Sequence, residues 1–212
     1  MFDRHRRSTE SPRGRVTLVL TFVFVLAYRL EQNIAYVLDV SPRQLVTLDT
    51  FPANALTQVF APVLHAGGDH LAATLVWVVP FGYFLERRRP WQDYVGFVVV
   101  AGFLTTTLAP VVFVVLGVAP GLGIGGSGVA YALVGREATA RLRTLPEWRS
   151  FSRVEWGILA VAVGGLALHL ASFVDSPARA SVVGHATGLV VGVVAGIGER
   201  YVSVGGEPAT HD

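Results

Sequence analysis

The sequence predicts an all-α membrane protein, a bundle of six transmembrane helices, and two observations lead to that fold class. Hydrophobic residues make up 52% of the 212 residues, whereas charged residues make up only 15%, well below the roughly 25% of a soluble domain. The charges also gather in short clusters. The stretches between them approach the length of about 20 residues that a helix needs to cross a bilayer.

Six apolar stretches follow one another along the chain. The first runs from Val16 to Val37 and contains Arg29 and Glu31. The other five cover residues 69–86, 94–118, 127 to about 135, 156–174 and 180–197. We therefore expect a cytoplasmic tail over residues 1–15, a six-helix membrane domain over residues 16–200, and a second cytoplasmic tail over residues 201–212. The long, partly apolar loop 38–64 suits a segment that lies in the membrane interface.

The distribution of arginine predicts the orientation of these spans. If there are six spans, 14 of the 17 basic residues lie on one side, and only Arg43 and Arg179 lie on the other. Because Lys and Arg concentrate in cytoplasmic loops, we expect a multi-pass protein of the cell membrane with both termini in the cytoplasm. A cleaved signal peptide is an alternative interpretation of the first span. No clear small-x-small cleavage site follows it, however, and its loss would invert the remaining topology.

The composition also excludes several kinds of site. The chain has no cysteine, which excludes disulfides, zinc–thiolate sites and a cysteine nucleophile. The net charge of only +2 gives little support to a nucleic-acid partner. His65, Asp69 and His70 are candidate metal ligands, but the HExxH pattern is absent. We therefore predict no metal, no cofactor and no nucleic-acid partner. The lipid bilayer is a predicted partner.

A glycine-rich segment, residues 121–128, leads into the fourth span and contains Ser127. Free N–H groups at the start of a helix can stabilise an oxyanion. Glycines such as Gly125 let a substrate backbone approach closely. A serine at this position can equally be a helix cap, and the G-x-S-x-G pattern of a hydrolase nucleophile elbow is absent. Taken alone, the segment leaves both interpretations open.

The sixth span carries a histidine beside a row of small residues. Glycines at 184, 188, 192 and 196 form a face for close helix contact, and His185 lies beside that face, about one turn from the outer end. An ionisable residue inside a span is a functional hypothesis, and an interfacial histidine bonded to a backbone carbonyl is the alternative. The predicted topology puts Ser127 and His185 at the same end of two parallel spans. A serine nucleophile needs such a base.

Three further residues belong with this pair. Tyr131 lies four residues after Ser127 and so shares its helical face, where its ring can pack against the imidazole. His70 and Thr74 are likewise four residues apart at the start of the second span, and we expect His70 near Ser127. For Thr74 we expect the hydroxyl to bond the backbone carbonyl one turn back, which leaves it little role in the site.

Taken together, these motifs resemble the rhomboid intramembrane serine proteases. The resemblance covers about residues 60–200. Each motif alone is weak, but the order, spacing and topology of the motifs together are specific. Its motifs are H-x4-H-L at 65–71, G-x-S-G at 125–128, Tyr131 and G-H-x-x-G-x-x-x-G at 184–192, with Gly82, Glu86 and Arg88 as further similarities.

The resemblance implies a six-helix core with a Ser–His dyad and an activity on transmembrane segments of other membrane proteins. Ser127 would be the nucleophile and His185 the general base. His70 and the Ser127 N–H would form the oxyanion hole, supported by Gly125 and Tyr131, and Thr74 stands at the position of a further family donor. Water would enter from the outer side through a cavity capped by a mobile loop. The cut would fall near a helix-destabilising stretch of the substrate.

The sequence departs from the family pattern at two places. Thr74 stands where rhomboids usually carry Asn, and the first loop lacks the usual Trp-Arg pair. A catalytically weak or inactive rhomboid-like protein that binds transmembrane helices is therefore a second hypothesis. An unrelated transporter is a third, but the broken helices paired between two halves that such proteins show are missing. The sequence does not predict the oligomeric state.

Overall fold

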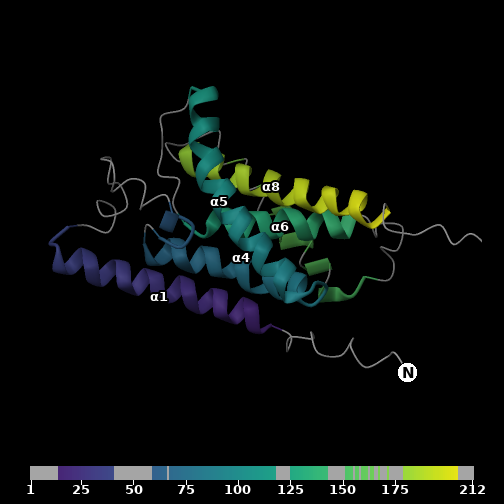
Figure 1. The fold of residues 1–212 in the computed structure, drawn as a ribbon, viewed down its shortest axis with the longest axis horizontal. Coiled ribbons are helices and arrows are strands. Elements are labelled where there is room, and N and C mark those ends of the chain that lie inside the picture. Colours follow the sequence, from purple (N-terminus) through teal and green to yellow (C-terminus); the bar gives the residue numbers. More distant parts are fainter. Residues whose placement is uncertain are drawn as a thin grey trace, which may run out of the picture.

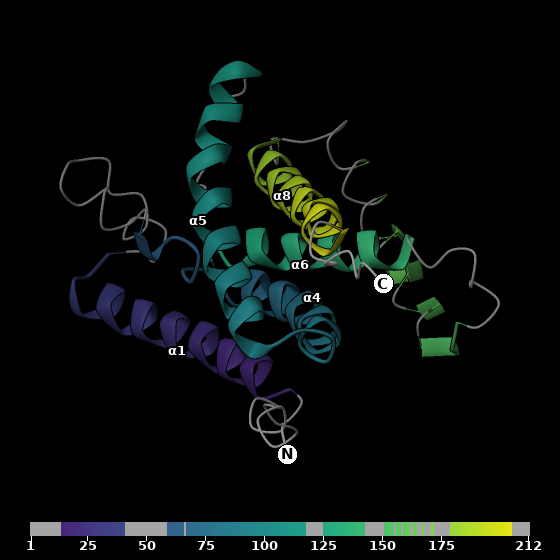
Figure 2. The ribbon, with the colours of Figure 1, turned by 45° about the vertical axis from the view of Figure 1, so that its right-hand side comes forward.

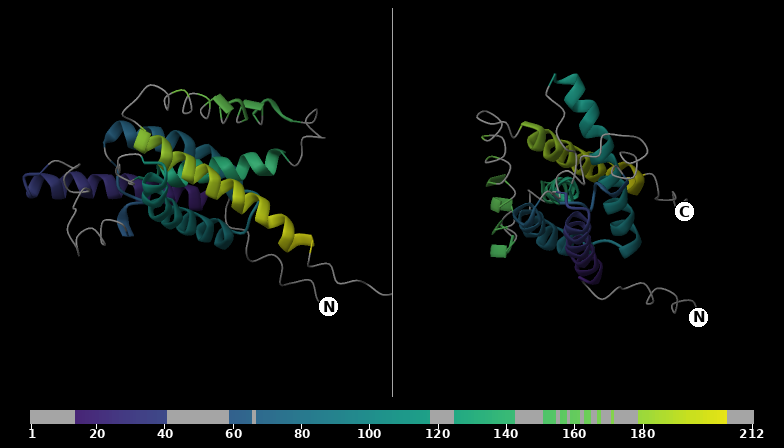
Figure 3. Two further views of the ribbon diagram at one scale, coloured as in Figure 1. Left: turned by 90° about the horizontal axis from the view of Figure 1, so that it is seen from above. Right: turned by 90° about the vertical axis from the view of Figure 1, so that its left-hand side faces the viewer.

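The computed structural model describes residues 14–40, 59–65, 67–117, 125–142, 179–204 and, with gaps, 151–171. Within these residues all regular secondary structure is helical, which confirms the all-α class. Short helical pieces between Arg153 and Ala171 lie in the region of the predicted fifth span, along one side of the bundle (Figure 3). The principal helices are α1 (Arg15–Val37), α4 (Gly68–Glu86), α5 (Trp91–Val115), α6 (Ser127–Leu142) and α8 (Arg179–Val204), shown in Figure 1.

The helix boundaries agree best with prediction near the N-terminus. α1 and α4 each begin one residue earlier than expected. α6 continues well past Gly135, and α8 continues to Val204, inside the segment expected to be a tail. Both helices run past the expected ends because the charges that follow each apolar stretch do not end the helix. Arg136 and Glu137 instead lie within α6, almost completely buried.

α6 is the central helix of the bundle. It contacts α4, α5 and α8, and Figure 2 shows it surrounded by them. From Ser127 to Glu137 every residue is buried except Tyr131, which is half-buried. α1, in contrast, exposes a row of large apolar side chains that includes Leu18, Phe22 and Leu26. Such a row suits contact with lipid, as on the outside of a membrane protein.

Two of the described helices, α1 and α5, are long and apolar enough to cross a membrane. A shorter apolar stretch, Val182–Gly198, lies within α8. α4 and α6 carry buried polar residues that face other helices, and such residues lower the apolar character of a segment without exposing charge to lipid. The structure therefore supports a membrane protein, and the count of six spans stays a prediction.

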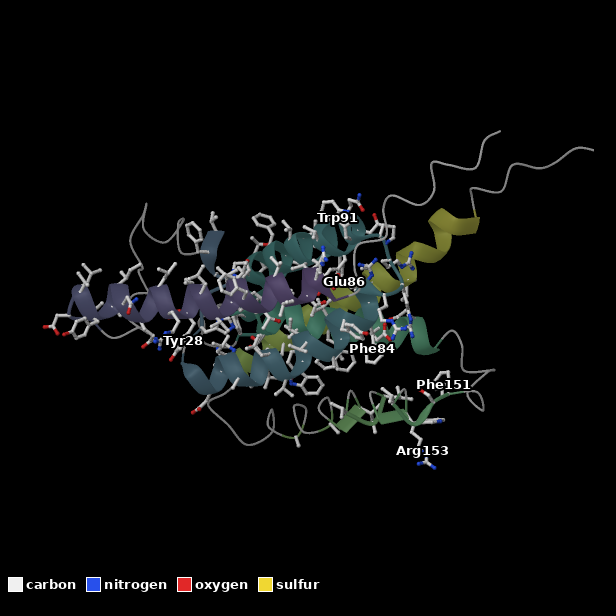
Figure 4. All side chains as sticks on the ribbon, turned by 90° about the horizontal axis from the view of Figure 1, so that it is seen from below. Tyr28, Phe84, Glu86, Trp91, Phe151 and Arg153 are labelled. Atoms are coloured by element: carbon white, nitrogen blue, oxygen red, sulfur yellow. The ribbon has the colours of Figure 1, made fainter. Side chains whose placement is uncertain are left out.

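One end of the bundle, called here the Glu86 end, is held together by a carboxylate at the start of α1. The backbone N–H groups of Val16 and Thr17 each donate to Glu86 at 2.9 Å, and the Thr17 hydroxyl donates at 2.8 Å. The first N–H groups of a helix have no partner within the helix, and the helix dipole favours an anion there. Glu86 of α4 thus caps α1 from a neighbouring helix, and Figure 4 shows it beside the beginning of α1.

The same end is closed by a second set of charged contacts. Arg88, just after α4, forms an ion pair with Glu137 of α6 at 2.8 Å, and the Glu137 side chain is 1% exposed. The guanidinium of Arg136 lies 4.3 Å from the centre of the Phe97 ring of α5, a distance typical of a cation–π interaction. These contacts explain how α6 can hold two adjacent charges inside the bundle.

Candidate active site

The opposite end, the Ser127 end, depends on unusually close contact between α6 and α8. A Cβ atom added at Gly188 would overlap the carbonyl of Gly128, and one added at Gly192 would overlap the carbonyl of Ala132. Gly196 lies against the side chain of Thr139. These contacts confirm the predicted glycine face. Gly184 is the exception, because no described atom lies within 4 Å of the position its Cβ would take.

Ser127 begins α6 and is 8% exposed. The Gly126 carbonyl accepts the hydrogen bond of the Ala130 N–H at 2.9 Å, so Gly126 holds the N-cap position and Ser127 the first helical one. A helix-capping serine would have to occupy the N-cap position, which Gly126 holds here. Gly125 has φ +118°, a conformation that favours glycine, and the Phe24 ring of α1 fills the space where a side chain at position 126 would lie.

His185 of α8 is held by a series of aromatic rings. Its imidazole stacks on the Tyr131 ring with centroids 4.5 Å apart and an interplanar angle of 15°, which confirms the packing expected for Tyr131. Trp77 of α4 lies next, 5.9 Å from Tyr131, and its ring stacks on Phe81. The sequence analysis missed Trp77, although it follows His70 by two helical turns and so shares its face of α4. The series restricts the plane of the imidazole.

His70 lies against the loop that leads to Ser127. A Cβ atom added to Gly125 would come within 2.6 Å of Cε1 of His70, so a side chain at position 125 would displace the imidazole. His70 therefore lies against Gly125, two residues before Ser127. A hydrogen-bond donor in this place is close to where an oxyanion would form beside the start of α6.

Thr74 departs from the expectation set for it. Its side chain is 2% exposed, and its hydroxyl has no hydrogen-bond partner within the described part of the chain. The predicted bond to the carbonyl one turn back is therefore wrong. Thr139 and Thr187 do make that bond, each at 2.8 Å. A threonine hydroxyl reaches that carbonyl only in certain χ1 rotamers, so the buried Thr74 holds its hydroxyl in another direction.

Two further buried groups, Glu31 and His65, meet at this end, and the role of Glu31 was not predicted from the sequence. Glu31 of α1 is 2% exposed and accepts the backbone N–H of His65 at 3.1 Å. Nδ1 of His65 lies 3.0 Å from the Val63 carbonyl, which assigns the proton to Nδ1, and burial, with a smaller contribution from His70, lowers the pKa of His65 to about 4. The signal that could have found Glu31 is its charge inside an apolar span.

The metal alternative receives no support from the geometry. The rings of His65 and His70 lie edge to face with centroids 5.5 Å apart. Among the residues that the structure describes, no group of three His, Cys, Asp or Glu side chains is arranged to hold a metal ion.

The fold and the site thus define a helical membrane protein. Its buried polar site lies at one end, between a glycine-rich loop and a glycine-faced helix. The model of the Rhomboid domain matches residues 52–201, which include α4, α5, α6 and nearly all of α8. The chain belongs to the rhomboid family. A search of curated protein sequences found no significant match.

Proposed function

We propose that the protein is an intramembrane serine endopeptidase that cleaves transmembrane segments of other membrane proteins by a Ser127–His185 dyad. One observation carries the proposal. The helix that begins with Ser127 meets the helix that bears His185 backbone to backbone, and the imidazole stacks on Tyr131, one turn after Ser127. A serine hydroxyl is a weak nucleophile, and a base held by neighbouring groups is the usual remedy.

In the proposed reaction, His185 accepts the Ser127 proton as Oγ attacks the scissile carbonyl. The acyl-enzyme forms when the C–N bond breaks and His185 gives that proton to the leaving amine. Water then attacks the acyl carbonyl as it loses a proton to His185. The bond between that carbonyl carbon and Ser127 Oγ breaks, and His185 returns the proton to Oγ as the acid leaves. The Ser127 N–H and the His70 ring would bind the oxyanion, and Gly125 would let the substrate backbone come close. The uncommitted Thr74 hydroxyl is a third candidate donor.

The proposal includes the membrane arrangement. Six spans would place the Ser127 end on the outer side and the Glu86 end, with its arginines, on the cytoplasmic side together with both termini. At 16 residues, α6 would be only about 24 Å long, shorter than the roughly 30 Å hydrocarbon core. A short central helix leaves room for water above Ser127, and the substrate would arrive through the surrounding bilayer.

A catalytically inactive protein that binds transmembrane helices is the second candidate function. The specific observation in its favour is Thr74 at the position where rhomboids usually carry Asn. A missing amide donor would weaken oxyanion stabilisation and leave the helix-binding surface intact.

Labelling with a serine-directed fluorophosphonate, combined with cleavage of a model transmembrane substrate, tests the proposal. We expect the purified wild-type protein to be labelled and active, and Ser127→Ala and His185→Ala to lose cleavage by about 10⁴-fold or more while remaining folded. Ser152→Ala is the matched control, and its activity should equal that of the wild type. Full cleavage by Ser127→Ala would refute the dyad. A folded wild-type protein that is neither labelled nor active would favour the helix-binding function.

A further inference from the structure

Glu31 of α1 is buried at the Ser127 end with only part of its bonding capacity used. One carboxylate oxygen accepts the His65 N–H, and the other has no hydrogen-bond partner among the described residues. Burying a carboxylate in this state costs free energy. An apolar side chain of the same size would remove that cost. Glu31 also lies outside the segment matched by the family model, residues 52–201, so the family resemblance assigns it no role.

The His65 N–H that Glu31 accepts belongs to a short segment, residues 61–65, which is hydrogen-bonded to α1 at one end and to the glycine loop at the other. The Phe60 carbonyl accepts the N–H groups of Val63 and Leu64, which folds the segment into a compact turn. Ala61 and His65, its two ends, are both completely buried. The His65 ring packs edge to face on Phe24 and on His70. The segment is therefore a rigid connection.

The other end of the 61–65 segment bonds directly to the loop that precedes the proposed nucleophile. The Ala61 carbonyl accepts the N–H of Gly125 at 2.7 Å, two residues before Ser127. Gly125 in turn lies against His70 and near the Leu64 carbonyl. An unbroken series of contacts thus leads from the Glu31 carboxylate through the segment to the backbone that sets the position of Ser127.

We infer that Glu31 is a positioning residue, which anchors the 61–65 segment so that the Gly125–Ser127 backbone and His70 keep the geometry that the reaction needs. The inference rests on the proposed protease function and deepens it. Glu31 touches neither the serine nor the substrate in this role. Because a displacement of about 1 Å can lower a rate about 100-fold, loss of the anchor should reduce kcat and leave substrate binding by the outer helix surfaces largely unchanged.

The test compares two substitutions of Glu31 with a matched one at the other end of the bundle. Glu31→Met keeps the side-chain volume but removes the acceptor, and Glu31→Gln keeps an oxygen that can accept the His65 N–H. Glu86→Met is the control, because Glu86 is the other buried carboxylate that accepts backbone N–H groups. The measurements are kcat and KM on one transmembrane substrate, the rate of fluorophosphonate labelling, and Tm, all on purified full-length protein.

For Glu31→Met we expect kcat and the labelling rate to fall about 10- to 100-fold with KM within about threefold of the wild type and Tm within about 5 °C. Glu31→Gln should keep kcat within about threefold, and the Glu86 control should keep kcat while Tm falls. If Glu31→Met does not fold, Glu31→Ala carries the same expectation, because its small side chain admits a water molecule at the His65 amide.

Three results would overturn the inference. They are a kcat within about threefold of the wild type in folded Glu31→Met or Glu31→Ala protein, an equal loss of kcat in Glu31→Gln and Glu31→Met, and a rise in KM that accounts for the whole loss. These failures are distinct from failure of the proposed function. If the proposed function itself fails, the wild-type protein is unlabelled and inactive, and the Glu31 variants are not compared.

Discussion

Two of the buried glutamates, Glu31 of α1 and Glu86 of α4, lie on neighbouring helices, and the protein satisfies them very differently. Glu86 accepts three hydrogen bonds and caps the start of α1. Glu31 accepts one, and its second oxygen has no partner in the described part of the chain. The same is true of Nε2 of His65, whose backbone N–H Glu31 accepts, and of the hydroxyl of Thr74, one turn after His70. Since most buried polar groups are hydrogen-bonded, these exceptions at the Ser127 end are informative.

The two ends of the bundle therefore differ in role: the Glu86 end contributes to stability, and the Ser127 end to the proposed chemistry. At the Glu86 end the carboxylates of Glu86 and Glu137 bond to groups from other parts of the chain, so this end contributes to the free energy of unfolding. At the Ser127 end the buried groups are held in place by packing but keep bonding capacity for a substrate, an intermediate or water. Proteins commonly retain unfavourable local features of this kind at functional sites. Substitutions at the two ends should therefore change different measured quantities.

Beyond the dyad itself, the largest effect is expected at the oxyanion side of the Ser127 end. His70→Ala should lower kcat about 10²- to 10³-fold, the usual cost of losing one oxyanion donor. Thr74→Ala should lower it only about tenfold, or roughly 1.4 kcal/mol, because a hydroxyl reaches less far than the amide of the usual Asn. Both are measured as kcat/KM on one substrate in proteoliposomes, with Tm as the control for folding. Equal losses in the two variants would make Thr74 a full donor.

The next largest effect is expected in stability, at the Glu86 end. Glu86→Met leaves two backbone N–H groups and the Thr17 hydroxyl without their acceptor. We expect the free energy of unfolding to fall by about 3 kcal/mol or more, which corresponds to a fall in Tm of roughly 6–12 °C for a chain of this size.

Cleavage by the folded fraction of Glu86→Met should stay within about threefold of the wild type. Thermal unfolding in detergent, followed by activity well below Tm, measures both quantities. A tenfold loss of kcat in fully folded protein would show that the two ends are coupled and would break the comparison.

The smallest effect concerns pH and His65. Burial holds the pKa of His65 at about 4, whereas the unfolded chain has a pKa near 6.5. As the pH falls below about 6.5, the unfolded chain takes up a proton that the folded protein does not, so stability is lost between about pH 6.5 and pH 4. At pH 5 the loss is about 2 kcal/mol.

His65→Gln removes this contribution and should flatten the dependence of Tm on pH between pH 7 and pH 5. His70 and Glu31, which lie beside His65, are unchanged in both proteins, so their titration cancels in the comparison. The same slope in the wild type and in His65→Gln would mean that His65 is not held neutral.

Much of the site was predictable because helix periodicity brings residues to one face before any tertiary contact is known. Glycines four residues apart predicted the close approach of α8 to α6, and the four-residue spacing from Ser127 to Tyr131 predicted the stacking on His185. Trp77 was missed because its partner lies on another helix. The hydroxyl of Thr74 was assigned wrongly because the sequence cannot specify a rotamer inside a packed interface.

The sequence by itself determined the membrane class, the family and which residues share a helical face, because apolar length, motif order and periodicity are properties of a linear chain. Only the tertiary structure decided which carboxylate meets which amide. Glu31 and His65 are 34 positions apart, and Thr17 and Glu86 are 69 apart. No local rule links such positions, because a hydrogen bond depends on distances of a few tenths of an ångström, and those distances are set only when the helices pack together.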